Sequence, residues 1–85
     1  MVKVLLYGEL AEMAGTPEVS VAGSRVLDVL TALASLYGSE FRNLVLSAGR
    51  VAVLVNGTPV RYGPLETRLT DGDVLSLMPL PDFED

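Results

Sequence analysis

The 85-residue sequence contains no cysteine and no histidine. Disulfide bonds are therefore excluded, and so are zinc sites built on thiolate or imidazole ligands. A cysteine nucleophile is excluded too, as is a serine nucleophile that depends on a histidine base. These absences remove the most common hydrolytic and metal-dependent enzymes. We therefore expect a protein that is not an enzyme, with no catalytic residues, no metal and no cofactor.

Positive charge is also scarce, because six Lys and Arg residues stand against eleven Asp and Glu residues and give a net charge of −5. That sign disfavours binding to nucleic acid or to an anionic membrane surface. The strand-like run Val2–Tyr7 is far shorter than the roughly 20 apolar residues that cross a bilayer, and no export signal follows it. We expect a cytoplasmic protein with neither a nucleic acid nor a membrane as its partner.

The remaining composition is that of a folded domain, with 49% hydrophobic and 20% charged residues. Alternating or continuous apolar runs predict several short strands. Asn56-Gly57 is a strong hairpin signal, and Pro59 places the return strand at a sheet edge because proline cannot donate to a ladder. The predicted strands are Val2–Tyr7, Glu18–Ala22, Val51–Val55, Thr58–Val60 and Asp73–Met78.

One helix dominates the predicted secondary structure. From Arg25 to Tyr37 the apolar residues follow the spacing of an amphipathic helix, with Ser24 as the expected N-cap and Gly38 as the expected left-handed residue after its end. Shorter helical segments are predicted at Glu9–Ala14, Ser39–Ser47 and Leu65–Leu69.

This order of elements predicts an α+β domain of two layers. We expect the ubiquitin-like β-grasp fold: a mixed sheet of four to five strands with one main helix packed on one face, and with the first and last strands as parallel neighbours. Residues 1–79 would form this domain. Residues 80–85, which include Asp82, Glu84 and Asp85, would form a flexible acidic tail.

Several segments carry a resemblance to a known family. They are Val2–Tyr7, Val26–Leu30, Val53–Gly57 and Leu69–Val74, within a match that covers about residues 2–79. The chain resembles the MoaD/ThiS sulfur-carrier proteins, and among them most closely the small subunit of molybdopterin synthase. The resemblance implies a protein cosubstrate in molybdenum or tungsten cofactor biosynthesis. It also implies two partners, a molybdopterin synthase large subunit and an E1-like adenylating enzyme.

The chain departs from the family at one motif. Sulfur carriers of this kind end in Gly-Gly, whose lack of side chains lets the reactive terminus enter narrow active sites. By register these glycines would fall near Phe83 and Glu84, and the 85 residues contain no two consecutive glycines. Two functions therefore stay open. One is a sulfur carrier, and the other is a non-catalytic β-grasp interaction or regulatory module that docks a partner protein.

The candidate partner-binding residues are Leu5, Tyr7, Leu54 and Met78. If Val2, Val4 and Leu6 face the helix, Leu5 and Tyr7 face outward, and Met78 joins them if Leu75 and Leu77 point inward. The run Val51–Val55 is apolar throughout, so either Ala52 and Leu54 or three valines also face out. An exposed apolar patch of this kind indicates an interface with a partner or a second copy. The alternative is that residues 39–47 or a loop cover it.

Three other motifs have ordinary structural explanations. Asp71 and Asp73 around Gly72 resemble a cation site, but turns of this composition are common without one. Glu9 and Glu12 are expected on a solvated face. Asn56-Gly57-Thr58 matches a glycosylation sequon, but the hairpin explains it in a cytoplasmic protein.

Overall fold

The computed structural model describes residues 1–46, 50–60 and 63–80. Its elements follow the predicted order along the chain, with three α-helices, one short 3-10 helix and five strands. In sequence they are β1 (Val2–Leu6), α1 (Glu9–Ala14), β2 (Glu18–Val21), α2 (Val26–Tyr37), α3 (Ser39–Leu46), β3 (Val51–Val55), β4 (Thr58–Pro59), η1 (Pro64–Glu66) and β5 (Val74–Pro79).

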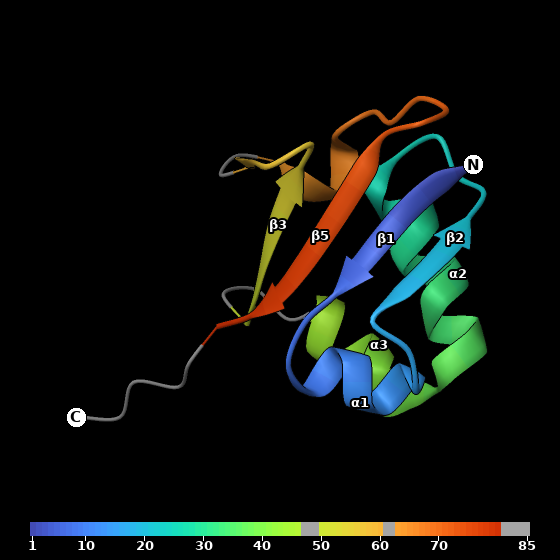
Figure 1. Cartoon of the computed structure of the whole chain (residues 1–85), viewed down its shortest axis with the longest axis vertical. Coiled ribbons are helices and arrows are strands. Elements are labelled where there is room, and N and C mark those ends of the chain that lie inside the picture. The colour runs from blue at the N-terminus through green and yellow to red at the C-terminus, as the bar shows by residue number, and fades with distance from the viewer. Residues whose placement is uncertain (47–49, 61–62, 81–85) are drawn as a thin grey trace.

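The five strands form one mixed sheet in the order β2-β1-β5-β3-β4. β1 and β5 are parallel neighbours at its centre, and the other three pairings are antiparallel. Figure 1 shows this sheet in front of the helices. The predicted β-grasp architecture, with its parallel pairing of the first and last strands, is confirmed.

The core lies between the sheet and the helices. Val2, Val4 and Leu6 of β1 are buried at 2% exposure or less, and Leu75 and Leu77 of β5 are fully buried. Register places Val4 beside Leu75 and Leu6 beside Leu77, so the inward side chains form continuous rows across the two strands. The side chains that β1 and β5 direct toward the core are therefore those that their alternating sequences predict.

α2 supplies most of the helical side of the core through Val26, Val29, Leu30 and Leu33, none of which is exposed. The helix begins one residue later than predicted, because Arg25 and not Ser24 occupies the N-cap position. The carboxylate of Asp28 explains the difference: it accepts hydrogen bonds from the backbone amides of Ser24 and Arg25 and from the Ser24 hydroxyl. Gly38 has the expected positive φ of 96°, but its ψ of −179° lies outside the left-handed helical region.

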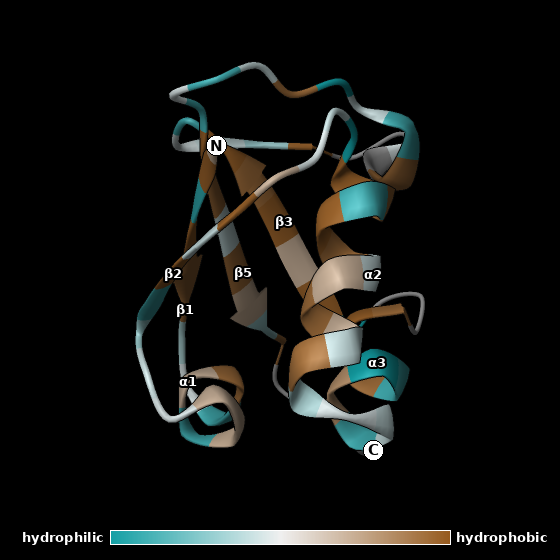
Figure 2. Cartoon of the chain, turned by 90° about the vertical axis from the view of Figure 1, so that its right-hand side faces the viewer, coloured by the Kyte–Doolittle hydropathy of each residue, from teal (hydrophilic) through white to brown (hydrophobic). Residues whose placement is uncertain are grey.

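α1 and α3 both lie at the lower end of the fold in Figures 1 and 2, α1 below the sheet and α3 below α2. Phe41 and Val45 of α3 are buried, while Leu44 is half-buried. The Phe41 ring packs against Tyr37 at a centroid distance of 5.3 Å. Phe41 and Val45 thus anchor α3 to the core and leave Leu44 beside α1 at its margin.

The remaining boundaries differ from the predicted ones by a few residues. The hairpin at Asn56-Gly57 forms with φ of 51° and 84° at its two turn residues, and β4 is the edge strand that Pro59 predicts. The predicted turn of helix at Leu65–Leu69 is the 3-10 helix η1, and Leu69 is buried after it. No helix within the described ranges is long and apolar enough to cross a bilayer. Of the predicted acidic tail, residues 81–85 fall outside the described ranges.

Candidate docking face

One face of the sheet points away from the helices, and we call it the outer face. Its apolar residues come from the three central strands and from Tyr7, which directly follows β1. Register pairs Leu5 with Ser76, Ser76 with Leu54, and Met78 with Ala52. The side chains of the outer face on these strands are Lys3, Leu5, Tyr7, Ala52, Leu54, Val74, Ser76 and Met78.

The centre of the outer face is a serine between two leucines. Ser76 is only 8% exposed although it faces away from the core, because Leu5 and Leu54 lie on the neighbouring strands at its level. Both leucines are half-buried. A small side chain between two large ones makes this part of the face apolar and closely packed.

Larger exposed side chains lie toward the end of the sheet where β5 finishes. Tyr7 is 43% exposed, Met78 is 41% exposed and Leu80 is 45% exposed. Tyr7 is joined to β5 by a hydrogen bond from its backbone N–H to the Leu77 carbonyl, with an N···O distance of 3.2 Å. We call Tyr7, Met78 and Leu80 the exit patch, because the chain leaves the sheet beside them.

A charged pair borders the apolar centre on the β2 side. The Lys3 ammonium lies 3.8 Å from the Glu18 carboxylate, and both side chains are about half exposed. Glu18 pairs in register with Leu5, so the ion pair lies next to the leucine. An apolar centre with a polar border is the usual composition of a protein interface.

No helix covers the outer face within the described part of the chain. Figure 2 shows α2 and α3 on one side of the sheet and α1 below its lower end, in line with the strands. α3 instead packs on α2 and is anchored to the core by Phe41 and Val45. The alternative in which residues 39–47 cover the patch is therefore wrong for the described residues 39–46.

The chain leaves β5 between two neighbouring segments. The Leu80 N–H donates to the Arg50 carbonyl over 2.8 Å, which extends the pairing with β3 by one residue. On the other side, a Cβ atom on Gly8 would lie 3.1 Å from Cγ of Pro79. Gly8, with its φ of 56°, thus lets the turn between β1 and α1 approach the end of β5 closely.

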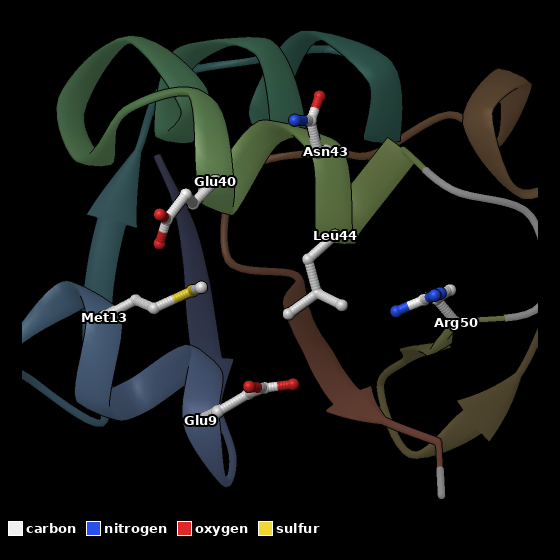
Figure 3. A pocket seen from close by; sticks show the side chains of 6 residues that line it. All are labelled: Glu9, Met13, Glu40, Asn43, Leu44 and Arg50. Carbon is white, nitrogen blue, oxygen red and sulfur yellow. The ribbon is translucent and has the colours of Figure 1, made fainter. Parts of the chain in front are cut away.

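A pocket of about 390 Å³ opens beside this exit, between α1 and α3. Glu9 and Met13 of α1 line it, together with Glu40, Asn43 and Leu44 of α3 and with Arg50, which precedes β3. Figure 3 shows Met13 between Glu9 and Glu40, with Leu44 between that group and Arg50. The pocket therefore has an acidic end, an apolar middle and a basic end.

The aspartates around Gly72 are occupied in structural contacts. The Asp73 carboxylate accepts hydrogen bonds from the Thr70 N–H at 2.8 Å, from the Thr70 hydroxyl at 3.3 Å and from the Asn56 side-chain amide at 3.1 Å. These hydrogen bonds lower the pKa of Asp73, with the Thr70 backbone as the largest cause. The Met1 ammonium hydrogen-bonds to Asp71 and lowers its pKa. Across residues 1–46, 50–60 and 63–80, no three acidic side chains gather as a metal site would require.

The structure brings the four predicted partner-binding residues onto one face. Leu5, Tyr7, Leu54 and Met78 all belong to the outer face, while their role in binding stays a prediction. Sequence reasoning missed Ser76 at its centre and Leu80 beside the exit. It also missed the pocket. The sequence places Glu9 and Glu12 on one solvated helix face, whereas in the structure Glu9 lines a pocket together with Glu40 and Arg50. No local signal marks that pocket, since its residues come from three separate segments.

Comparison with known proteins gives a consistent result. The model of the ThiS family matches residues 4–81. No curated protein sequence matches the chain significantly.

Solved structures match over nearly the whole chain. Small archaeal modifier protein 1 from Methanosarcina acetivorans is 33% identical with a TM-score of 0.82, over 92% of this chain and 90% of that one. A chain of the BexX/CysO complex from Amycolatopsis orientalis is 27% identical with a TM-score of 0.82, over 99% and 100%. A protein assigned as molybdopterin converting factor subunit 1 from Pyrococcus furiosus is 28% identical with a TM-score of 0.73, over 92% and 94%.

Proposed function

This chain belongs to the ThiS family, and from that membership and its outer face we propose that it docks a larger protein partner. It is a small β-grasp protein similar to molybdopterin converting factor subunit 1. The family acts as a protein cosubstrate and not as a catalyst. One similar structure is itself a complex of two proteins, BexX and CysO. Docking through the outer face is the function that this geometry supports best.

The observation that carries the proposal is the apolar outer face together with the exit patch. Tyr7 and Met78 expose more than 40% of their surface on a face that no helix covers among the described residues. Tyrosine near the centre of an interface supplies a large apolar contact and a hydroxyl that stays satisfied at the rim. Because Leu80 belongs to the exit patch, we expect a docked partner also to contact the segment that leaves β5.

The partner we propose is a protein of the molybdopterin synthase large-subunit kind. The similarity to a molybdopterin converting factor subunit 1 supports this choice over an unrelated partner. An E1-like adenylating enzyme is the second partner that the family resemblance implies. Family membership favours a sulfur-carrier role, which requires both of these partners, whereas Phe83 and Glu84 in place of the family's two glycines favour the alternative, a non-catalytic interaction module.

The proposal is tested by charge substitutions on the exit patch. We expect Tyr7→Glu and Met78→Glu each to weaken binding to a purified molybdopterin synthase large subunit by roughly 30-fold or more, as loss of a hot-spot residue of about 2 kcal/mol does. Isothermal titration calorimetry measures the affinity. Leu36→Glu is the matched control, because Leu36 is 64% exposed on α2, behind the sheet.

Two results would contradict the proposal. The affinity could stay unchanged in both patch variants while circular dichroism shows them folded, or Leu36→Glu could weaken binding as much as they do. Size-exclusion chromatography of the unmodified chain separates a further case. If the chain is a dimer that Tyr7→Glu dissociates, and the large subunit does not bind, then the outer face serves self-association and not partner docking.

A further inference from the structure

The pocket between α1 and α3 holds two carboxylates that have no partner among the residues that the structure describes. The ion pairs found among the described residues are Met1–Asp71 and Lys3–Glu18, and no hydrogen bond to the side chain of Glu9 or Glu40 occurs there. Both glutamates are exposed to solvent at the acidic end of the pocket. They are therefore free to accept hydrogen bonds from a ligand.

The middle of the pocket is apolar and adjoins this acidic end. Met13 is 36% exposed between the two glutamates, and the half-buried Leu44 continues the apolar surface toward Arg50. A ligand that suits this arrangement has a cationic head and an aliphatic stem. Arginine and lysine side chains have this form, since they bury their methylene groups on apolar surface while the charged head stays with polar groups.

Arg50 determines how a cationic ligand is oriented in the pocket. Figure 3 shows the Arg50 guanidinium across Leu44 from Glu40 and Met13, where it repels a cation placed beside it. A basic side chain therefore binds with its head at Glu9 and Glu40 and with its stem over Leu44. The volume of about 390 Å³ lies at the lower end of the range for ligand pockets, which fits one side chain better than a large cofactor.

We propose that this pocket receives an arginine or lysine side chain of the partner that docks on the outer face. Its place in the fold supports that source. Glu9 follows Gly8, where an added Cβ would lie only 3.1 Å from Cγ of Pro79, and the Arg50 carbonyl accepts a hydrogen bond from the Leu80 N–H. The pocket and the exit patch therefore flank the same point of the chain. The identity of the partner rests on the proposed function, whereas the chemistry of the pocket does not.

The chemistry is tested without any partner. The probe is N-acetyl-arginine amide, titrated into the full ¹⁵N-labelled chain while NMR follows the amide signals of Met13 and Leu44. We expect saturable shifts with a dissociation constant on the order of millimolar, and no saturation with the neutral analogue N-acetyl-citrulline amide. Glu9→Gln and Glu40→Gln should each weaken binding roughly two- to fivefold, as loss of a solvent-exposed ion pair does. Arg50→Gln should strengthen it.

Matched controls and a second probe make the test decisive. Glu12→Gln removes the same charge from α1 outside the pocket and should leave the affinity unchanged. Equal binding of the citrulline analogue, or tighter binding of N-acetyl-glutamate amide, overturns the proposal. Binding of the arginine probe needs no large subunit, so failure of the docking proposal is distinguishable from failure here.

The source of the basic side chain is tested with the large subunit. The double variant Glu9→Gln/Glu40→Gln should lower the affinity for the purified large subunit, and Glu12→Gln should not. If the arginine probe binds but this affinity is unchanged, the pocket serves a free small cation, and the assignment to a partner side chain is overturned.

Discussion

At the scale of single residues, Asp73 links the turn that precedes β5 to the β3–β4 hairpin. Its carboxylate accepts hydrogen bonds from Thr70 and Asn56, and the Asn56 side-chain oxygen in turn accepts the Val74 N–H at 2.9 Å. Because these hydrogen bonds stabilise the ionised form, the folded pKa of Asp73 lies below its ordinary value of 3.8. The network therefore stabilises the fold only while Asp73 is charged.

This network predicts a pH dependence of stability. Since the folded pKa is lower than the unfolded pKa, the contribution of Asp73 is complete above the ordinary value and is lost as pH falls through the folded pKa. We expect the unmodified chain to lose stability more steeply than Asp73→Asn does as pH is lowered below about 5. Urea unfolding at a series of pH values measures this. Glu66→Gln is the control for the loss of one negative charge. Parallel curves of unfolding free energy against pH for the unmodified chain and Asp73→Asn would contradict the prediction.

The sequence predicted part of this residue-scale result. Asp71-Gly72-Asp73 indicates a turn, and in the structure Asp73 accepts hydrogen bonds from Thr70 within that turn, while Asp71 contacts the Met1 ammonium. The hydrogen bond to Asn56 was not predictable in the same way, because Asn56 and Asp73 are brought together only when β3 pairs with β5. A local pattern cannot show a contact that depends on sheet pairing.

At the scale of elements, α2 gives the sharpest test of packing. Leu30 is fully buried against the sheet, whereas Leu36 on the same helix is 64% exposed. Leu30→Ala should lower the free energy of unfolding by about 2–5 kcal/mol, the usual cost of removing a core leucine. Leu36→Ala, which makes the same chemical change, should cost no more than about 0.5 kcal/mol. Chemical denaturation measures both, and equal losses would mean that the helix face is assigned incorrectly.

The strands β1 and β3, which flank β5, show how much side-chain periodicity alone can predict. β1 alternates between apolar and mixed positions, so its sequence predicts that Val4 faces the core and that Leu5 faces out. β3 is apolar at every position and leaves both orientations open. The structure resolves the choice through register: Val53 pairs with the buried Leu77, while Leu54 pairs with Ser76 on the outer face. The inward and outward side chains of β3 therefore follow from its pairing with β5, whose own alternation is predicted by its sequence.

At the scale of the whole molecule, thiocarboxylation of this 85-residue polypeptide separates the two functions that the sequence leaves open. With ATP, a sulfur donor and an E1-like enzyme, we expect the 85-residue chain to show no mass change for exchange of a terminal oxygen by sulfur. The reason is that Phe83 and Glu84 bring side chains where the family resemblance places glycines. A variant with Gly-Gly in place of Phe83-Glu84-Asp85 should gain this mass change. Intact-mass spectrometry measures this mass change, and a thiocarboxylate on the unmodified sequence would contradict the prediction.

The pocket also belongs to the molecular scale. Glu9, Glu40 and Arg50 lie in three segments that come together only because α1 and α3 both lie at the end of the sheet where β5 finishes. Each segment by itself indicates an ordinary solvated helix or turn. Sites of this kind become visible only after the topology is known.

The place of β5 at the centre of the sheet has a consequence for how the protein is made on the ribosome. Of the five strands that the structure describes, β5 is synthesised after the other four, yet β1 and β3 both pair with it and not with each other. Until it emerges, β1 and β3 each present an unpaired edge to the cell, and such edges promote aggregation. Closing the sheet then joins segments from opposite ends of the sequence, which slows folding. Nascent chains that stop before Val74 should therefore need a chaperone more than the finished protein does.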